Sequence, residues 1–286
     1  MIINRNLSAM FAARHFGITQ TLLNGSIERL SGGMRINRAG DDPAGLAVSE
    51  RMRAQIRGLN AAARNAQNGV SLIRTAEGFL QGTQDVLQHL RELAVQAANG
   101  IFTAEDRLFI QVEVSQLVAE VDRIANHAQF NGMNLLTGRF GRPAGENAPT
   151  ASMWFHVGAN TDQRVRAFIG TMTAAALGIG NAGGDAFISL ETQEDANRAI
   201  VTLDAALRLV SAQRANLGAY QNRLEFAVRS IEIGAENLQA SESRIRDANM
   251  ASETVSHTRN MILAQAGLAM LSHANMRNML ALRLFD

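Results

Sequence analysis

The chain has 286 residues, of which 47% are hydrophobic, so it is long enough for one or two domains with a substantial core. Its formal net charge is only +1, which offers no general footprint for nucleic acid or a membrane surface, and we expect neither nucleic-acid binding nor membrane insertion. The absence of cysteine excludes disulfides, thiolate nucleophiles and cysteine metal sites.

The N-terminal segment 1–30 has apolar residues at three- and four-residue steps, which predicts an amphipathic helix that begins almost at Met1. Chain ends are normally frayed and polar, so this apolar stripe suggests burial against something. Three glycines in 31–40 then break the helix. Asp42-Pro43 restarts it, with the aspartate as N-cap and the proline at the first helical position.

The stretch 52–97 carries the strongest pattern in the chain, an apolar seam with alternating steps of four and three residues. One pair of consecutive three-residue steps, around Ile73, is a stammer that should overwind a supercoil locally. A helix over this stretch is a rod roughly 70 Å long. Asn99-Gly100 is a typical C-terminal signal for it. Another part of the chain, or another chain, must cover its seam.

The remaining elements supply partners for this rod. Thr103–Asp106 resembles a capping box and opens a second helix with a seam over 110–128. The β-prone runs 152–157 and 164–169 predict a hairpin. A third seam over 200–245 matches the first rod in length, which predicts an antiparallel bundle completed by the second helix. Residues 255–285 form a last apolar helix.

The predicted fold is mainly α: a long antiparallel coiled-coil or helical bundle with a small β-hairpin insert and paired terminal helices. We expect 1–42 and 247–286 to form one domain of terminal helices. Residues 43–246 form the long-helix bundle domain, including the loop and hairpin insert at 138–190. Paired terminal helices would still expose apolar surface, and such surface usually marks an interface.

Chemical motifs are weak throughout the sequence. The six histidines include no pair at helical metal-ligand spacing, and no serine lies in a G-x-S-x-G turn. Gly178–Gly183 matches G-x-G-x-x-G but lacks the surrounding βαβ unit, so a flexible loop is expected there. We therefore expect no catalytic residue, no metal site, no cofactor and no enzyme activity.

Charged residues gather at the two joints between the bundle and the terminal helices. Ser243–Met250 mixes both signs, and Arg35, Arg38 and Asp41 occur at the matching N-terminal joint. Two interpretations stay open: a solvated helix joint, or a polar contact zone that fixes the register between limbs or subunits. The matching charges favour the second.

These joints carry a resemblance to bacterial flagellins. The motifs are Ile27–Asn37 with Asp41–Ala47, followed by Asn65–Gly69, Arg91–Gln96, Gln221–Leu224, Ser243–Met250 and Ala269–Leu271. In the middle, Ser152–Asn160 and Ile169–Ala174 are similar to the periplasmic flagellins of spirochaetes, the FlaB-type filament core proteins. The resemblance covers about 1–140 and 190–286.

The resemblance implies a structural subunit that polymerises into the flagellar filament for motility. The terminal helices would form the inner tube, and the bundle would form the surrounding layer. Export through the flagellar type III apparatus agrees with an N-terminus that lacks the pattern of a secretory signal. The location expected is a periplasmic flagellum, with an external filament as the alternative.

The implied partners are copies of this chain, possible flagellin isoforms, a hook–filament junction protein, an export chaperone at the C-terminal helix and a sheath protein. Recognition by an innate-immune Toll-like receptor is left open, because His89 stands where many flagellins have arginine. Gly32 and Asn249 also depart from the usual serine and aspartate.

We expect the filament interface to include both apolar residues of the terminal helices and polar residues of the joints and the bundle. The candidates are Ile3, Leu7, Met10, Leu22, Leu30, Arg35, Ile36, Asp41, Arg91, Leu93, Glu113, Arg244, Arg246, Asp247, Leu263, Met270 and Leu271. Seven of the apolar candidates should be poorly ordered in monomers and buried after assembly: Ile3, Leu7, Met10, Leu22, Leu263, Met270 and Leu271.

Two alternatives come from other classes of protein. A hook–filament junction or cap-type protein would share terminal helices of this kind. An enzyme with its site in 140–190 would need an insert of the kind some flagellins carry, but this segment has no H-E-x-x-H motif.

Overall fold

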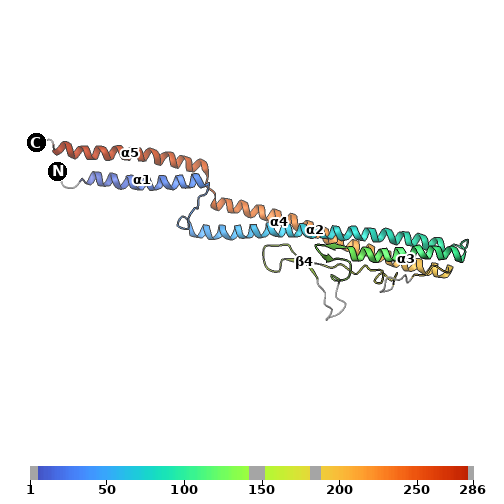
Figure 1. Cartoon of the computed structure of the whole chain (residues 1–286). Helices are drawn as coiled ribbons and strands as arrows, with labels where there is room; N and C mark the ends of the chain where they lie inside the picture. The colour runs from blue at the N-terminus through green and yellow to red at the C-terminus, as the bar shows by residue number, and fades with distance from the viewer. Residues whose placement is uncertain (1–5, 142–151, 181–187, 283–286) are drawn as a thin grey trace. The chain divides into compact units, whose positions relative to one another are not determined.

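The structure is a computed structural model that describes residues 6–141, 152–180 and 188–282 (Figure 1). In these residues the elements are, in chain order, α1 (Leu7–Gly32), α2 (Pro43–Ala97), α3 (Ala104–His127), β1 (Gln129–Phe130), β2 (Met133–Asn134), β3 (Met153–His156), β4 (Arg164–Ala167), α4 (Gln193–Arg246) and α5 (Met250–Leu282). The predicted fold class, mainly α with a small hairpin, is confirmed.

The chain divides into two compact units. The terminal unit consists of Met1–Ile56 with Glu236–Asp286, and the central unit consists of Arg57–Ala235. Both boundaries fall inside the long helices α2 and α4.

The terminal unit is built on the antiparallel pair α1 and α5, so the prediction that the two terminal helices pair is confirmed (Figure 1). Asn6, the N-cap of α1, donates from its side chain to the Ala274 carbonyl at 3.0 Å. At the other end of the pair, Arg29 binds Glu253 at 2.9 Å. The partner number falls as the α1 number rises, which is the mark of antiparallel packing.

In the central unit, α2 and α4 run antiparallel, with Arg74 bound to Glu225 at 3.2 Å and Arg91 bound to Asp204 at 2.7 Å. The predicted seam of α2 is buried from Ala66 to Ala97. Thr83, its one polar member, is fully buried and donates its hydroxyl to the Phe79 carbonyl at 3.2 Å. The hydroxyl is therefore satisfied within the helix, and the seam stays continuous.

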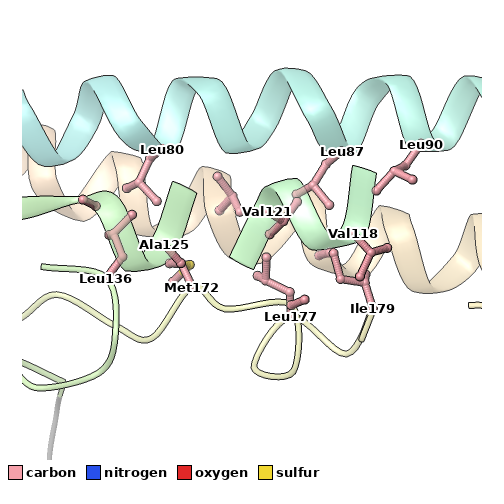
Figure 2. Close-up of a cluster of buried hydrophobic side chains, with 14 of the residues drawn as sticks. Leu80, Leu87, Leu90, Val118, Val121, Ala125, Leu136, Met172, Leu177 and Ile179 are labelled. Carbon is pink, nitrogen blue, oxygen red and sulfur yellow. The ribbon is translucent and has the colours of Figure 1, made fainter. Parts of the chain in front are cut away.

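Helix α3 is the third member of this bundle. Its predicted capping box is present, because the Thr103 hydroxyl accepts from the Asp106 N–H and the Asp106 carboxylate accepts from the Thr103 N–H. Its buried face meets side chains from α2, as Figure 2 shows for Leu87, Val118 and Val121.

An irregular segment after β4 covers α3 from the opposite side. Met172, Leu177 and Ile179 join the same buried cluster (Figure 2). The carboxylate of Asp122 in α3 accepts from the Ala174 N–H at 2.7 Å and helps to hold the segment in place. Of the glycine-rich run expected to be a flexible loop, the described part contains the fully buried Ile179. These residues lie outside every helix and strand, as expected of a loop, and Ile179 anchors the loop in the core. Residues 181–183 lie outside the described residues.

The predicted hairpin is formed by β3 and β4, paired antiparallel from Met153↔Ala167 to His156↔Arg164. The hairpin packs closely against α2 at Gly69. A Cβ added at Gly69 would lie 2.8 Å from the Phe155 ring, so only glycine lets the strand approach this closely.

Candidate assembly surface

Helices α1 and α5 turn much of their apolar surface outward. Of the α1 residues that the structure describes, only Ser26 is buried, and among the α5 side chains described, at 250–277, only Ala264 is buried. The exposed large apolar residues of the pair are Leu7, Met10, Phe11, Ile18, Leu22, Ile27, Met250, Val255, Met261, Ile262, Leu263, Leu268, Met270 and Met276. An apolar set this extensive on two adjacent helices is typical of an interaction surface.

The predicted interface residues of these helices lie in this set or at its edge. Leu7, Met10 and Leu22 are 52, 60 and 52% exposed, and Leu263 and Met270 are 50 and 63% exposed. Two others, Leu30 and Leu271, are half-buried. Ile3 lies outside the described residues.

A shallow apolar groove of about 440 Å³ runs along α5. It is lined by Val255, Ile262 and Leu263 together with Thr254, Thr258 and Arg259. The groove faces are mostly carbon, so its contents in an assembly should be apolar side chains.

The joint beside α1 and α5 is held by main-chain hydrogen bonds between the segment that follows α1 and the segment that links α4 to α5. Arg35 N–H donates to the Arg246 carbonyl at 2.7 Å, and Ala248 N–H donates to the Gly33 carbonyl at 2.9 Å. Gly33 has φ +68°, a left-handed conformation that favours glycine. Ile36 is fully buried in this joint.

Charged side chains reinforce the same joint. The Arg35 guanidinium donates to the Ile245 carbonyl at 2.6 Å, and Arg246 binds Glu50 at 2.6 Å. The hydrogen bond from Arg246 holds the pKa of Glu50 below its usual range. Asp247 accepts from the Ser243 hydroxyl at 2.5 Å.

Asp41 orders the turn that leads into α2. Its carboxylate accepts from the Arg38 N–H at 2.8 Å and from the Asn37 N–H at 3.0 Å. These backbone donors lower the pKa of Asp41. Arg38 in turn binds Glu28 at 2.9 Å, whereas Arg244 donates to Ser241 at 3.0 Å.

Arg29 and Glu253 form the charged contact between α1 and α5, and neither is among the predicted interface residues. The hydrogen bonds from Arg29 lower the pKa of Glu253. The two residues are 224 positions apart, so no local spacing could have indicated the pair.

A second group of predicted residues lies in the central unit. Arg91 is exposed and bound to Asp204, and Glu113 is exposed and 3.1 Å from the His89 imidazole. The hydrogen bond to Glu113 raises the pKa of His89. Leu93 is buried in the core cluster.

Other kinds of site find little support in the described part of the chain. Within 6–141, 152–180 and 188–282, no three acidic or histidine side chains gather closely enough to hold a metal ion. Over the same residues, no helix is long and apolar enough to cross a bilayer.

Comparison with known families accounts for the terminal helices and the long bundle. The family described as "Bacterial flagellin N-terminal helical region" matches residues 3–140, and "Bacterial flagellin C-terminal helical region" matches 200–284. The chain belongs to the bacterial flagellin family. As a flagellin it is a structural protein and not an enzyme.

Relatives of this flagellin match along almost the whole chain. "Flagellin FlaB2" of Treponema pallidum (strain Nichols) is 65% identical over 275 residues, which are 96% of each chain. "Flagellar filament core protein flaB2" of Brachyspira hyodysenteriae is 58% identical over 286 residues, which are 100% of each chain. The predicted resemblance to spirochaete flagellins is confirmed.

Among solved structures, a flagellar hook-associated protein of Vibrio parahaemolyticus has a TM-score of 0.56 to this flagellin. The match covers 72% of this chain and 100% of the other at 14% identity. At that identity the likeness shows a shared fold alone.

Proposed function

We propose that this flagellin is the core subunit of a spirochaete periplasmic flagellar filament and that it polymerises through its terminal helices. The exposed apolar surface of α1 and α5 is the observation that carries the proposal. Water contact with this surface is unfavourable in a single chain and is removed when subunits pack together. The spirochaete relatives, one of them described as a filament core protein, give the kind of filament.

In this proposal, residues 1–42 and 247–286 form the inner tube and residues 43–246 form the layer around it. Leu7, Met10, Leu22, Leu263 and Met270, exposed in the single chain, become buried between subunits. Ile3 belongs to the same apolar stripe by sequence, and Leu30 and Leu271 lie at its edge.

The joint residues keep the terminal helices in register with the bundle. Arg35, Arg246 and Asp247 act through the backbone and side-chain bonds described above, with Asp41 and Arg244 at the flanking turns. Ile36 and Leu93 are buried within the subunit, so they hold the contact surfaces in shape. Arg91 and Glu113 offer polar contacts on the bundle.

The partners that follow are further copies of this chain, other flagellin isoforms, a hook–filament junction protein and a sheath protein. An export chaperone would cover the apolar face of α5 before assembly, since that face is exposed in the single chain.

Fractionation of the source cells combined with antibody labelling in electron micrographs tests the proposal. Label on filaments beneath the outer membrane is the expected result. Label on external filaments would keep the filament subunit but overturn its periplasmic location. Label confined to the hook junction, with no long filaments formed by the purified protein, would favour the junction-protein alternative.

A further inference from the structure

The sequence contains four Asn-Gly steps, which begin at Asn24, Asn68, Asn99 and Asn131. Asparagine followed by glycine is the pair most prone to deamidation, because glycine has no Cβ to block attack by its nitrogen on the neighbouring side chain. We propose that Asn99 is a site of spontaneous deamidation and that the fold directs the reaction to Asn99 and away from the other three steps.

The reaction needs only water as a co-reactant. The Gly100 nitrogen loses its proton to solvent and attacks Cγ of Asn99. A new N–Cγ bond forms, the bond to the side-chain amide nitrogen breaks, and ammonia leaves. Water then opens one of the two imide bonds of the resulting succinimide, which gives aspartate or isoaspartate with no change of oxidation state.

The helices protect two of the four asparagines. Asn24 lies inside α1 and Asn68 lies inside α2, where the backbone nitrogens are engaged in the helical ladder and the dihedral angles are fixed. Ring closure would require the helix to open locally. Around Gly69 the Phe155 side chain also leaves no room for such movement.

Asn131 is restrained by the β1–β2 hairpin. It occupies a two-residue turn with φ +49°, and its neighbours Phe130 and Met133 are paired across the strands. A turn clamped on both sides cannot readily rotate to bring the side chain onto the next nitrogen.

Asn99 lies outside the helical ladder and outside any paired strand, although its N–H donates to the Gln96 carbonyl at 3.1 Å and its carbonyl accepts from the Phe102 N–H at 3.4 Å. Helix α2 ends at Ala97, and both Asn99 and Gly100 are exposed in the corner that follows. In the part of the chain that the structure describes, the Gly100 N–H has no acceptor. The nitrogen that must attack is therefore free.

The corner also stabilises the charge that develops during attack. The Ile101 N–H donates to Oδ1 of Asn99 at 3.3 Å, which polarises the carbonyl and supports negative charge on its oxygen. Arg107 donates to the Asn99 carbonyl at 3.2 Å and to the Ala97 carbonyl at 2.9 Å. Its fixed positive charge favours both the deprotonated nitrogen and the carboxylate product.

Deamidation changes both the charge and the main chain of the corner that follows α2. A carboxylate would stand at the C-terminus of α2, where the helix dipole disfavours negative charge. Isoaspartate would also lengthen the main chain inside a turn that Arg107 anchors. Older molecules should thus differ from newly made ones at one defined place.

Peptide mapping by mass spectrometry tests the site. The purified full-length protein is held at mildly alkaline pH, and isoaspartate is assayed with an isoaspartyl methyltransferase. The Asn99 peptide should convert first, while those containing Asn24, Asn68 and Asn131 stay unchanged. Conversion of any of these three asparagines as fast as Asn99 would overturn the proposal.

Gly100→Ala is the matched variant. A Cβ at Gly100 meets nothing within 4 Å, and its φ is not positive, so the fold should be retained. The variant should lose most of the conversion at Asn99 with an unchanged melting curve. In urea, the four wild-type sites should convert at similar rates. If the native ranking persists in urea, the fold does not direct the reaction.

Discussion

Glu253 and His89 each face an oppositely charged side chain from another helix, and they respond to pH in opposite directions. Arg29 lowers the pKa of Glu253, so this contact stabilises the fold above the ordinary glutamate pKa and is lost as pH falls through the lower folded value. Glu113 raises the pKa of His89, so that contact is present in full below the ordinary histidine pKa and is lost as pH rises through the higher folded value.

Glu253→Gln should weaken the pairing of α1 and α5 at neutral pH by about 1 kcal/mol or less, because the pair is partly solvated. Thermal unfolding followed by circular dichroism should show the loss at neutral pH and little difference in acid, where wild-type Glu253 is itself protonated. Glu236→Gln, at an exposed residue of α4, is the control. An equal deficit at both pH values would argue against the charged contact.

Glu113→Gln should lower the pKa of His89 toward the ordinary histidine value. The imidazole Nε2 lies 3.1 Å from the Glu113 carboxylate, and Nδ1 lies 3.6 Å from that of Glu92, so one acidic neighbour remains. Titration of the His89 ring protons by NMR measures the shift. Glu105→Gln, at an exposed position in the first turn of α3, should leave it unchanged. A His89 pKa indifferent to Glu113→Gln would refute the assignment.

At the scale of elements, the contact between α2 and the β3–β4 hairpin depends on glycine. Gly69→Ala would place a Cβ 2.8 Å from the Phe155 ring and 3.1 Å from Leu224, and such overpacking typically costs about 1–3 kcal/mol. Gly78→Ala on the same helix meets nothing and should stabilise by about 0.5–1 kcal/mol. Urea unfolding compares them; a shift of the same sign in both would contradict the packing argument.

Local signals explain which elements could be predicted. The capping box at Thr103 and the apolar seam ending at Ala97 are set by neighbours in sequence, and both are found where the pattern indicates. The layer containing Met172 and Ile179 has no period of its own. Its order comes from α3, through contacts such as Asp122 with Ala174, so the sequence pattern could not reveal it.

The residues of the candidate assembly surface also divide into those that a local pattern could predict and those that depend on long-range contacts. The exposed leucines and methionines of α1 and α5 could be predicted from their apolar spacing near the chain ends. The contacts that align these helices could not, since Arg35 meets Arg246 and Arg29 meets Glu253 more than two hundred positions away. Long-range pairs of this kind carry no signal in a single sequence.

At the scale of the whole molecule, assembly and folding should be separable. The buried cluster of the central unit runs from Val70 to Leu224 and includes none of the described side chains in 255–277. Deleting 255–286 should therefore abolish polymerisation but leave the bundle folded. Leu271→Asp should likewise abolish polymerisation by placing a charge on the apolar face of α5. Leu271→Met, which keeps the apolar volume, should still polymerise. Electron microscopy and circular dichroism measure the two properties. Normal filaments from Leu271→Asp would refute the role of this face, and loss of helicity in the bundle on deletion would refute the separation.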